Sequence, residues 1–154
     1  MTQTHILFVC HGNICRSPMA EFIFRDLVKK RGLEGRITCA SAGISDEERG
    51  NPVYPPARRK LQALGIDCAG KRARQMTRAD YAQYDLLIGM EDINLRRMRQ
   101  ICGGDAEGKI HLLLEDAPCP RDIADPWYMG DFDTACSDIL EGCELLLGKI
   151  AGRA

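Results

Sequence analysis

The sequence predicts one α/β domain of three layers, in which a four-stranded parallel sheet is flanked by helices on both faces. Short apolar runs, each the length of one buried strand, alternate with segments whose apolar residues recur at helical spacing. The chain has 154 residues, 45% of them hydrophobic, which is enough to bury a core of its own. No repeat, low-complexity tract or linker interrupts it, so we expect residues 1–154 to fold as a single domain.

The four predicted strands are the apolar runs at 5–9, 37–41, 84–89 and 109–114. The first run, HILFV, directly precedes a loop that contains a glycine. A polar stretch with three prolines at 45–56 follows the second run and is typical of a long loop. Because helical segments separate the runs, we expect the strands to be parallel and covered on both faces.

Four helices are expected, at 18–30, 56–64, 91–102 and 134–151. The first carries one apolar stripe, formed by Ala20, Ile23, Phe24 and Leu27. Ser17 and Pro18 suit the N-cap and the first helical position, which would start this helix just after the glycine loop. Gly142 lies inside the last helix, where a glycine costs about 1 kcal/mol relative to alanine.

Composition excludes several classes of protein. The 21 basic and 22 acidic residues leave a net charge of −1, without the basic excess that nucleic-acid binding needs. No apolar run approaches the roughly 20 residues of a membrane span, and the N-terminus lacks a signal-peptide pattern. The eight cysteines form no C-x-x-C pair and the three histidines are scattered, which disfavours a zinc site. We therefore expect a cytoplasmic protein with reduced thiols and without a nucleic-acid or membrane partner.

The chemistry is expected in the loop after the first strand, VCHGNICRSP. In open α/β sheets, ligands bind where strands end, and the unpaired N–H groups of a helix N-terminus attract anions. Gly12 and Asn13 tolerate the positive φ angles that turn successive N–H groups inward. This positive field stabilises a cysteine as its thiolate, and Ser17 can donate a hydrogen bond to the Cys10 sulfur. Arg16 adds a planar fork that can hold two phosphoryl oxygens.

The bare spacing C-x5-R carries little information, because it recurs at Cys68 and Arg74. At that second copy no apolar strand precedes the cysteine, and no hydroxyl residue or helix signal follows the arginine. The surrounding strand, Gly-Asn turn and helix start therefore distinguish the first copy as the functional one.

The loop resembles the signature of the low-molecular-weight protein-tyrosine phosphatase family, V-C-x-G-N-x-C-R-S-P-x-A-E. The matching residues are Val9, Cys10, Gly12, Asn13, Cys15, Arg16, Ser17, Pro18, Ala20 and Glu21. The likeness continues at 41–43, 74–77, 85–94 and 125–128, and so covers nearly the whole chain. The resemblance implies a four-stranded parallel sheet flanked by helices, and hydrolysis of phosphotyrosine through a cysteinyl-phosphate intermediate. We expect a monomer that acts on phosphotyrosine-containing proteins without metal or cofactor, because the loop amides and Arg16 already neutralise the phosphoryl charge.

The resemblance also implies a role for each site residue. Cys10 would be the nucleophile and Arg16 the clamp on the phosphoryl oxygens. Asp125 would protonate the departing tyrosyl oxygen and then take a proton from the hydrolytic water. Asn13, Ser17 and Ser41 would hold the phosphate loop by hydrogen bonds. The other site residues would complete that loop or form an apolar wall beside the substrate: His11, Gly12, Ile14 and Cys15 in the loop, Trp127 and Tyr128 in the wall.

The substrate class remains open between two alternatives. Glu47 and Glu48 occupy a loop in which many family members carry an aromatic residue that faces the substrate. Acidic side chains there should disfavour acidic phosphopeptides, and they favour a protein-arginine phosphatase on the same scaffold. Relatives that hydrolyse phosphoarginine tend to have threonine in place of Ile14, whereas an apolar Ile14 suits an aromatic ring. The sequence therefore favours phosphotyrosine, with phosphoarginine as the alternative.

Two further classes are less favoured. An arsenate reductase would need a relay of thiols near the site, and only Cys102 lies in the expected region. A non-catalytic anion-binding module would be expected to lack the nucleophile or the acid, and both are present. Cys15 either packs under the loop or closes a protective disulfide with Cys10 on oxidation. The sequence leaves that choice open, as it does the phosphorylation of Tyr128.

Overall fold

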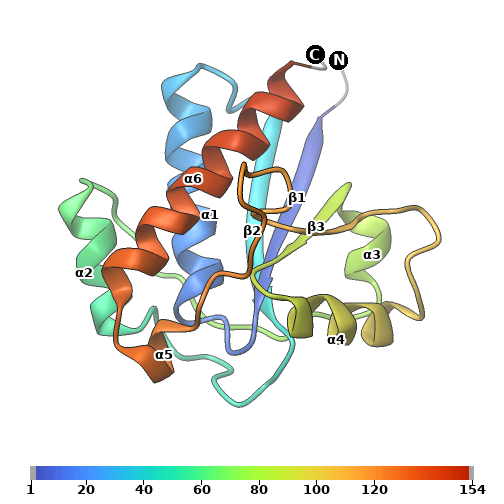
Figure 1. Cartoon of the computed structure of the whole chain (residues 1–154), viewed down its shortest axis with the longest axis horizontal. Coiled ribbons are helices and arrows are strands. Elements are labelled where there is room, and N and C mark those ends of the chain that lie inside the picture. The colour runs from blue at the N-terminus through green and yellow to red at the C-terminus, as the bar shows by residue number, and fades with distance from the viewer. Residues whose placement is uncertain (1–2, 153–154) are drawn as a thin grey trace.

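The computed structural model describes residues 3–152, and its central feature is a parallel sheet (Figure 1). The strands are β1 (Thr4–Cys10), β2 (Ile37–Gly43), β3 (Leu86–Gly89) and β4 (Ile110–Leu112). Their order in the sheet is β2-β1-β3-β4. β1 lies between β2 and β3, since Ile6 pairs with Cys39 on one side and with Leu86 on the other. This order places the loop that follows β1 in the middle of one end of the sheet.

β1 contributes to the core on both faces of the sheet. Ile6, Leu7, Phe8 and Val9 are completely buried. Because side chains alternate along a strand, Ile6 and Phe8 join the apolar cluster on one face, and Leu7 and Val9 join the cluster on the other. Burial on both faces explains why this segment is a continuous apolar run rather than an alternating one.

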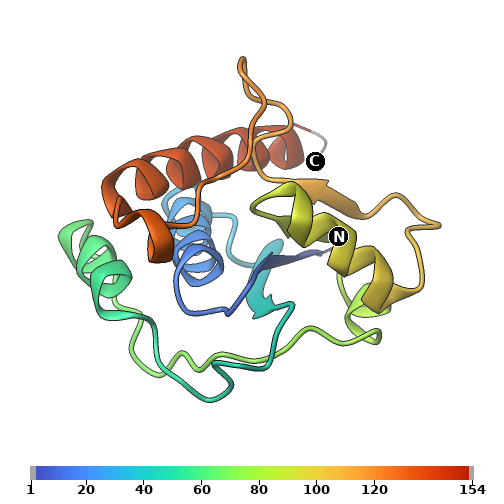
Figure 2. The same ribbon diagram turned by 60° about the horizontal axis from the view of Figure 1, so that its bottom comes forward.

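Helices cover both faces of the sheet (Figures 1 and 2). They are α1 (Arg16–Lys30), α2 (Pro55–Ala63), α3 (Asp80–Gln83), α4 (Asp92–Cys102), α5 (Pro126–Met129) and α6 (Phe132–Ala151). α1 and α6 cover the face of Phe8, where Phe24 and Ile139 belong to the same cluster. α4 covers the face of Leu7 with Leu95. The predicted three-layer α/β fold is therefore confirmed. None of the described helices is both long and apolar enough to cross a membrane.

The start of the first helix differs from its prediction. Ser17 is not the N-cap: α1 begins at Arg16, and Cys15 takes the cap position without a side-chain hydrogen bond. Ser17 lies in the first turn, and its hydroxyl contacts the Cys10 sulfur. The local capping preference of serine was outweighed here by a tertiary hydrogen bond.

The other differences concern element ends and short elements. β4 is shorter than the predicted run 109–114 because the chain enters a series of turns after Leu112. β3 starts two residues later than predicted, whereas β1 and β2 extend to Cys10 and Gly43. The one-turn helices α3 and α5 were not predicted, since four residues are too few to show an apolar stripe.

Candidate active site

The loop between β1 and α1 turns tightly at the end of the sheet. Asn13 has a φ of 61°, and no other non-glycine residue within 3–152 has a positive φ. Asparagine tolerates this left-handed conformation better than most residues do. The end of β2 lies so close to the turn that a Cβ on Gly43 would be 2.7 Å from the His11 carbonyl oxygen. Asn13 and Gly43 therefore allow the loop to close around the N-terminus of α1.

Cys10 lies at the end of β1, and its side chain is connected to a buried hydrogen-bond network. The Cys10 Sγ is 3.0 Å from the Ser17 Oγ. Asn13 Nδ2 donates to the Ser17 Oγ at 2.8 Å and to the Ser41 Oγ at 3.0 Å, and Asn13 Oδ1 accepts from the Arg74 backbone N–H at 3.0 Å. Asn13, Ser17 and Ser41 are all buried, so these bonds restrain the loop. The sequence assigned no role to Arg74.

The network continues to Glu21, a buried carboxylate to which the sequence assigned no role. Ser41 Oγ donates to Glu21 Oε1 at 2.5 Å, and Arg25 and Lys71 form ion pairs with the carboxylate at 2.6 and 3.3 Å. Burial lowers the pKa of Lys71, although the Glu21 charge acts in the opposite direction. The one signal for Glu21 was its position in the matching signature, because nothing local distinguishes it from a surface glutamate.

Arg16 is buried although it is charged. Its Nη1 donates to the Ile123 carbonyl oxygen at 2.8 Å, while its Nη2 lies 3.1 Å from Glu91 Oε1 and 3.3 Å from Asp125 Oδ2. Burial by itself would lower the pKa of this guanidinium, but the charges of Cys10, Asp125 and Glu91 outweigh burial and raise the pKa. These contacts compensate the buried charge and fix the direction of the guanidinium. The sequence assigned no role to Glu91 or Ile123.

Asp125 is the N-cap of α5, and each of its oxygens has a partner. Oδ1 accepts from the Trp127 backbone N–H at 3.0 Å, and Oδ2 faces Arg16. These two contacts hold the carboxylate in place. Because 19% of the side chain is still exposed, it also reaches the pocket. A helix cap thus positions the residue that the resemblance assigned as the acid.

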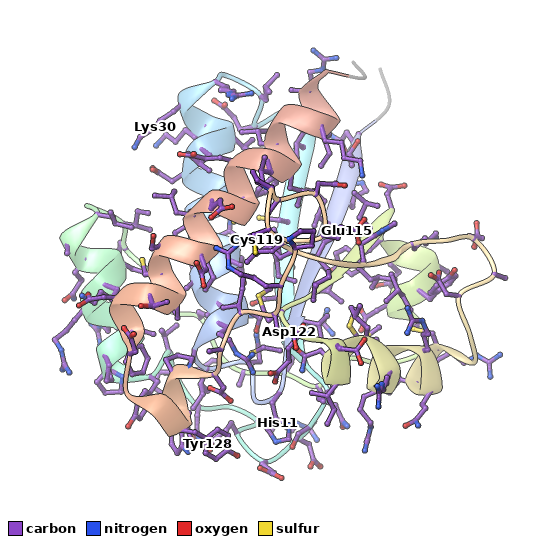
Figure 3. All side chains as sticks on the ribbon, in the orientation of Figure 1. His11, Lys30, Glu115, Cys119, Asp122 and Tyr128 are labelled. Carbon is purple, nitrogen blue, oxygen red and sulfur yellow. The ribbon has the colours of Figure 1, made fainter. Side chains whose placement is uncertain are left out.

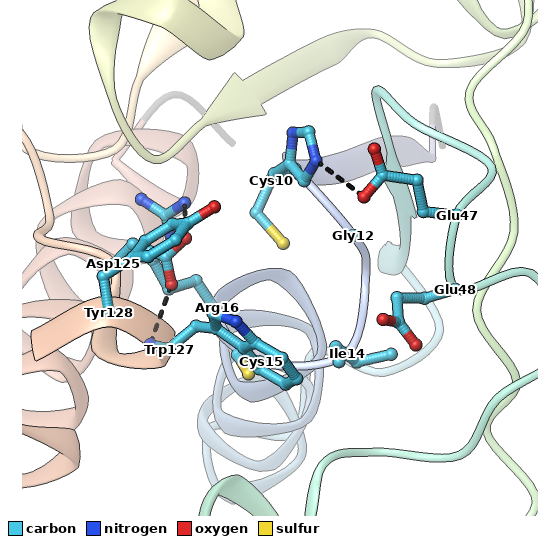
Figure 4. Close-up of a pocket in the computed structure, with 11 residues that line it drawn as sticks. Cys10, Gly12, Ile14, Cys15, Arg16, Glu47, Glu48, Asp125, Trp127 and Tyr128 are labelled. Carbon is cyan, nitrogen blue, oxygen red and sulfur yellow. Dashed lines mark hydrogen bonds and ion pairs between the residues drawn. The ribbon is translucent and has the colours of Figure 1, made fainter. Parts of the chain in front are cut away.

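These groups line a pocket of about 110 Å³ (Figure 4). The loop around Cys10 forms its floor, and Trp127 and Tyr128 stand on the side of Asp125. Trp127 is 48% exposed and Tyr128 is 79% exposed, so both rings are available to a ligand. Figure 3 shows Tyr128 and His11 at the same end of the molecule, away from Lys30.

Acidic side chains form the opposite side of the pocket. Glu47 and Glu48 extend toward it from the loop after β2 (Figure 4). His11 Nε2 lies 3.4 Å from Glu47 Oε2 at this rim. The pocket can therefore hold an anion on its floor and a flat group between an aromatic wall and an acidic rim.

Two thiols, Cys10 and Cys15, face this pocket. Burial, together with the charges of Cys10 and Asp125, raises the pKa of the Cys15 thiol, so Cys15 is protonated at neutral pH. All eight cysteines are free thiols. Cys102 is buried in the cluster around Leu7 and does not line the pocket. The described part of the chain contains no group of three His, Cys, Asp or Glu side chains that could hold a metal ion.

The structure divides the predicted site residues into two sets. Those that line the pocket are Cys10, His11, Gly12, Ile14, Cys15, Arg16, Asp125, Trp127 and Tyr128. Those that lie behind the loop and bind it are Asn13, Ser17 and Ser41. The arrangement suits the chemistry predicted from the sequence, and the role of each residue remains a prediction.

Comparison with known proteins gives matches over nearly the whole chain. The family model described as "Low molecular weight phosphotyrosine protein phosphatase" matches residues 5–153. The low molecular weight protein-tyrosine-phosphatase YfkJ of Bacillus subtilis is 44% identical over 148 residues, which cover 94% of each chain. The low molecular weight phosphotyrosine protein phosphatase of Sus scrofa is 35% identical over 150 residues, again 94% of each chain.

Solved structures show the same extent of similarity. The crystal structure of YfkJ from Bacillus subtilis has a TM-score of 0.94 at 42% identity, and the match covers 99% of this chain and 98% of that one. The crystal structure of DARP, the drosophila arginine phosphatase, has a TM-score of 0.87 at 31% identity, with coverage of 94% and 96%. The similarity therefore extends over the fold and is not confined to the loop.

Proposed function

The chain belongs to the low molecular weight phosphotyrosine protein phosphatase family, and we propose that it hydrolyses phosphotyrosine in proteins through a cysteinyl-phosphate intermediate, without a metal ion. The observation that carries the proposal is the presence of Cys10, Arg16 and Asp125 in one pocket. The reaction needs a nucleophile, positive charge for the phosphoryl oxygens and an acid for the leaving oxygen. The three residues offer one group for each need.

In the first step the Cys10 thiolate attacks phosphorus, so that an S–P bond forms while the bond between phosphorus and the tyrosyl oxygen breaks. Ser17, 3.0 Å from the sulfur, can donate a hydrogen bond to the thiolate, and the N-terminus of α1 adds a positive field. Arg16 and the loop N–H groups bind the three other phosphoryl oxygens. Asp125, protonated at this stage, gives its proton to the departing oxygen, and tyrosine leaves as a neutral phenol.

In the second step a water molecule attacks the phosphorus of the cysteinyl phosphate. The Asp125 carboxylate accepts a proton from that water, the S–P bond breaks, and its electron pair returns to sulfur. Inorganic phosphate leaves, and both the thiolate and the protonated acid are restored. Arg16 and the loop N–H groups supply positive charge in both steps, and for this reason we propose that no metal is needed.

The pocket walls support an aromatic substrate. Trp127, Tyr128 and Ile14 offer apolar surface on which a phenyl ring can stack. A protein-arginine phosphatase is the second candidate, because Glu47 and Glu48 could accept hydrogen bonds from a guanidinium. We rank phosphotyrosine first, since a guanidinium against Ile14 would lack partners for part of its N–H groups. We further propose that the enzyme acts on phosphoproteins as a monomer in the cytoplasm, where its eight free cysteines would stay reduced.

The test is to measure initial rates on two peptides of the same sequence, one with phosphotyrosine and one with phosphoarginine, with a chelator present. Wild type is expected to hydrolyse the phosphotyrosine peptide faster, and Cys10→Ser to reduce this rate to background because its hydroxyl is a far weaker nucleophile than a thiolate. Cys119→Ala removes an exposed thiol outside the pocket and serves as the control that keeps full activity. Rapid denaturation at alkaline pH, where a cysteinyl phosphate is stable, should trap the phosphoryl group on Cys10 in peptide maps.

Each of the other possible results would contradict a different part of the proposed function. Faster hydrolysis of phosphoarginine would mean that the acidic rim decides the substrate. Loss of activity with the chelator would contradict metal independence. No turnover of either peptide would favour an arsenate reductase or an anion-binding module.

A further inference from the structure

A second hollow, which we name the α2 groove, adjoins the catalytic pocket. Its volume is about 520 Å³, and it is formed by residues 51–55 and the exposed side of the first turns of α2. It shares three lining residues with the catalytic pocket, namely Ile14, Glu48 and Trp127. α2 lies beside the corner between α5 and α6 in both views of the ribbon (Figures 1 and 2). A substrate bound in the pocket by its phosphoryl group would therefore have this groove directly beside it.

The wall between the pocket and the groove is a packed unit. The ring of Tyr54 lies 4.6 Å from that of Trp127 and 6.0 Å from that of Phe132, measured between centroids. The Tyr54 backbone N–H donates to the Ile14 carbonyl oxygen at 2.9 Å, which ties the groove to the phosphate loop. Since the groove is anchored to this loop, its position relative to Cys10 is set by the same residues that form the active site.

The two ends of the α2 groove differ in charge. Glu48 stands at the end shared with the pocket, and its carboxylate accepts a hydrogen bond from Asn51 at 2.6 Å. Arg58 and Arg59 line the part formed by α2, and both are exposed. Neither arginine forms an ion pair with another residue among those that the structure describes. Two cations without an acidic partner at the end of an apolar groove favour a ligand that brings a carboxylate.

We propose that the α2 groove binds the polypeptide segment that flanks the phosphotyrosine, with an acidic side chain of that segment against Arg58 and Arg59. This inference rests on the proposed function and names a substrate class for it. Glu48 disfavours an acid directly beside the phosphotyrosine, whereas the arginines attract one farther along the peptide. The proline and tyrosine side chains between them offer apolar surface to the intervening residue. The preferred substrates thus carry an acidic residue that is not adjacent to the phosphotyrosine in the peptide sequence.

The test uses phosphotyrosine peptides in which aspartate replaces glutamine at each flanking position in turn, with p-nitrophenyl phosphate as a substrate too small to reach the groove. We expect wild type to prefer aspartate at one or two positions that are not adjacent to the phosphotyrosine. The variant Arg58→Gln/Arg59→Gln is expected to lower kcat/KM for that peptide about three- to tenfold, mainly through KM. Its kcat/KM for p-nitrophenyl phosphate should stay at the wild-type value. Added salt should weaken the preference in the wild type.

Two further variants test whether the preference depends on the charges in the groove. Charge reversal, Arg58→Glu/Arg59→Glu, is expected to transfer the preference from aspartate to lysine at the same position. Arg96→Gln/Arg97→Gln removes an exposed cationic pair on α4, outside the groove, and should leave the preference unchanged. The inference about the groove would be overturned if Arg58→Gln/Arg59→Gln and Arg96→Gln/Arg97→Gln lost the same amount of kcat/KM. It would also be overturned if kcat/KM of the wild type did not depend on the position of the aspartate. Failure of wild type to hydrolyse either kind of substrate would instead overturn the proposed function.

Discussion

The two oxygens of Asp125 serve different purposes. Oδ1 caps α5 through the Trp127 N–H, and Oδ2 faces Arg16 at the pocket. The cap holds the carboxylate in place while its other oxygen stays available for proton transfer. Asparagine caps a helix about as well as aspartate does, but it cannot give or take the proton. One substitution therefore separates the structural role of this residue from the catalytic role that we propose for it.

Asp125→Asn is expected to lower kcat for a phosphotyrosine peptide by about 10²- to 10⁴-fold while the melting temperature changes little. The loss should be smaller for p-nitrophenyl phosphate, because its phenolate leaves readily without a proton. Steady-state kinetics with both substrates and thermal unfolding check this. Asp131→Asn is the matched control, since Asp131 caps α6 through the Thr134 N–H and lies outside the pocket. An equal loss with both substrates, or a similar loss in the control, would contradict the acid role.

At the level of secondary-structure elements, α6 packs unusually closely on the chain that leaves β4. A Cβ on Gly142 would lie 2.5 Å from the Leu113 Cγ, which is the branch point of a buried side chain and cannot move freely. Judged from the sequence alone, Gly142 is unfavourable because glycine has a low helix propensity. The structure shows why a glycine suits this position: it lets the helix approach the residue that follows β4.

Gly142→Ala is therefore expected to reduce the free energy of unfolding by about 1–3 kcal/mol, because overpacking outweighs the gain in helix propensity of about 1 kcal/mol. Gly148→Ala provides the comparison in the same helix, since a Cβ there meets nothing within 4 Å. That variant should be stabilised by up to about 1 kcal/mol. Denaturant titration of both variants measures the difference. A stabilised Gly142→Ala would show that α6 can shift away from Leu113 at little cost.

For the whole molecule, the fold buries thiols that are solvated in the unfolded chain. Cys143 is completely enclosed between α6 and α1, and burial raises its pKa well above the ordinary value of 9.0. Burial also raises the pKa of Cys39 to about 12. At alkaline pH the unfolded chain therefore loses thiol protons that the folded chain retains. Under these conditions the unfolded state binds fewer protons, and the free energy of unfolding falls as the pH rises.

We expect this decrease to begin near pH 8, where thiols of the unfolded chain start to ionise, and to be still under way at about pH 10, because the folded-state pKa of Cys39 is about 12. The slope should reach up to about 1.4 kcal/mol per pH unit for each fully buried thiol. Urea titrations across this range, with a reducing agent present, measure the slope. Cys143→Ala should make the slope shallower, whatever its effect on stability at neutral pH. Cys119→Ala, which removes an exposed thiol, should leave the slope unchanged. Identical slopes in all three proteins would show that thiol burial does not set the alkaline response.

The sequence by itself predicted the fold class and the centre of the site, because both depend on short contiguous segments. The apolar run of β1, the Gly-Asn turn and the first turns of α1 follow one another within residues 5–21, so their periodicity and turn residues are visible locally. Cys10 and Arg16 come from the same segment. Asp125 lies far from it, and only the resemblance to a family identified that residue.

The tertiary structure alone decided which distant groups complete the site. Arg16 is bound by Glu91, 75 positions away, and by the Ile123 carbonyl, 107 positions away. The network behind the loop ends on Glu21, and Ser17 serves that network rather than the predicted helix cap. The α2 groove likewise joins residues from three separate segments of the chain. A parallel sheet brings the ends of separate strands to one edge, and the polar groups that meet there have no local pattern, since their partners exist only after folding.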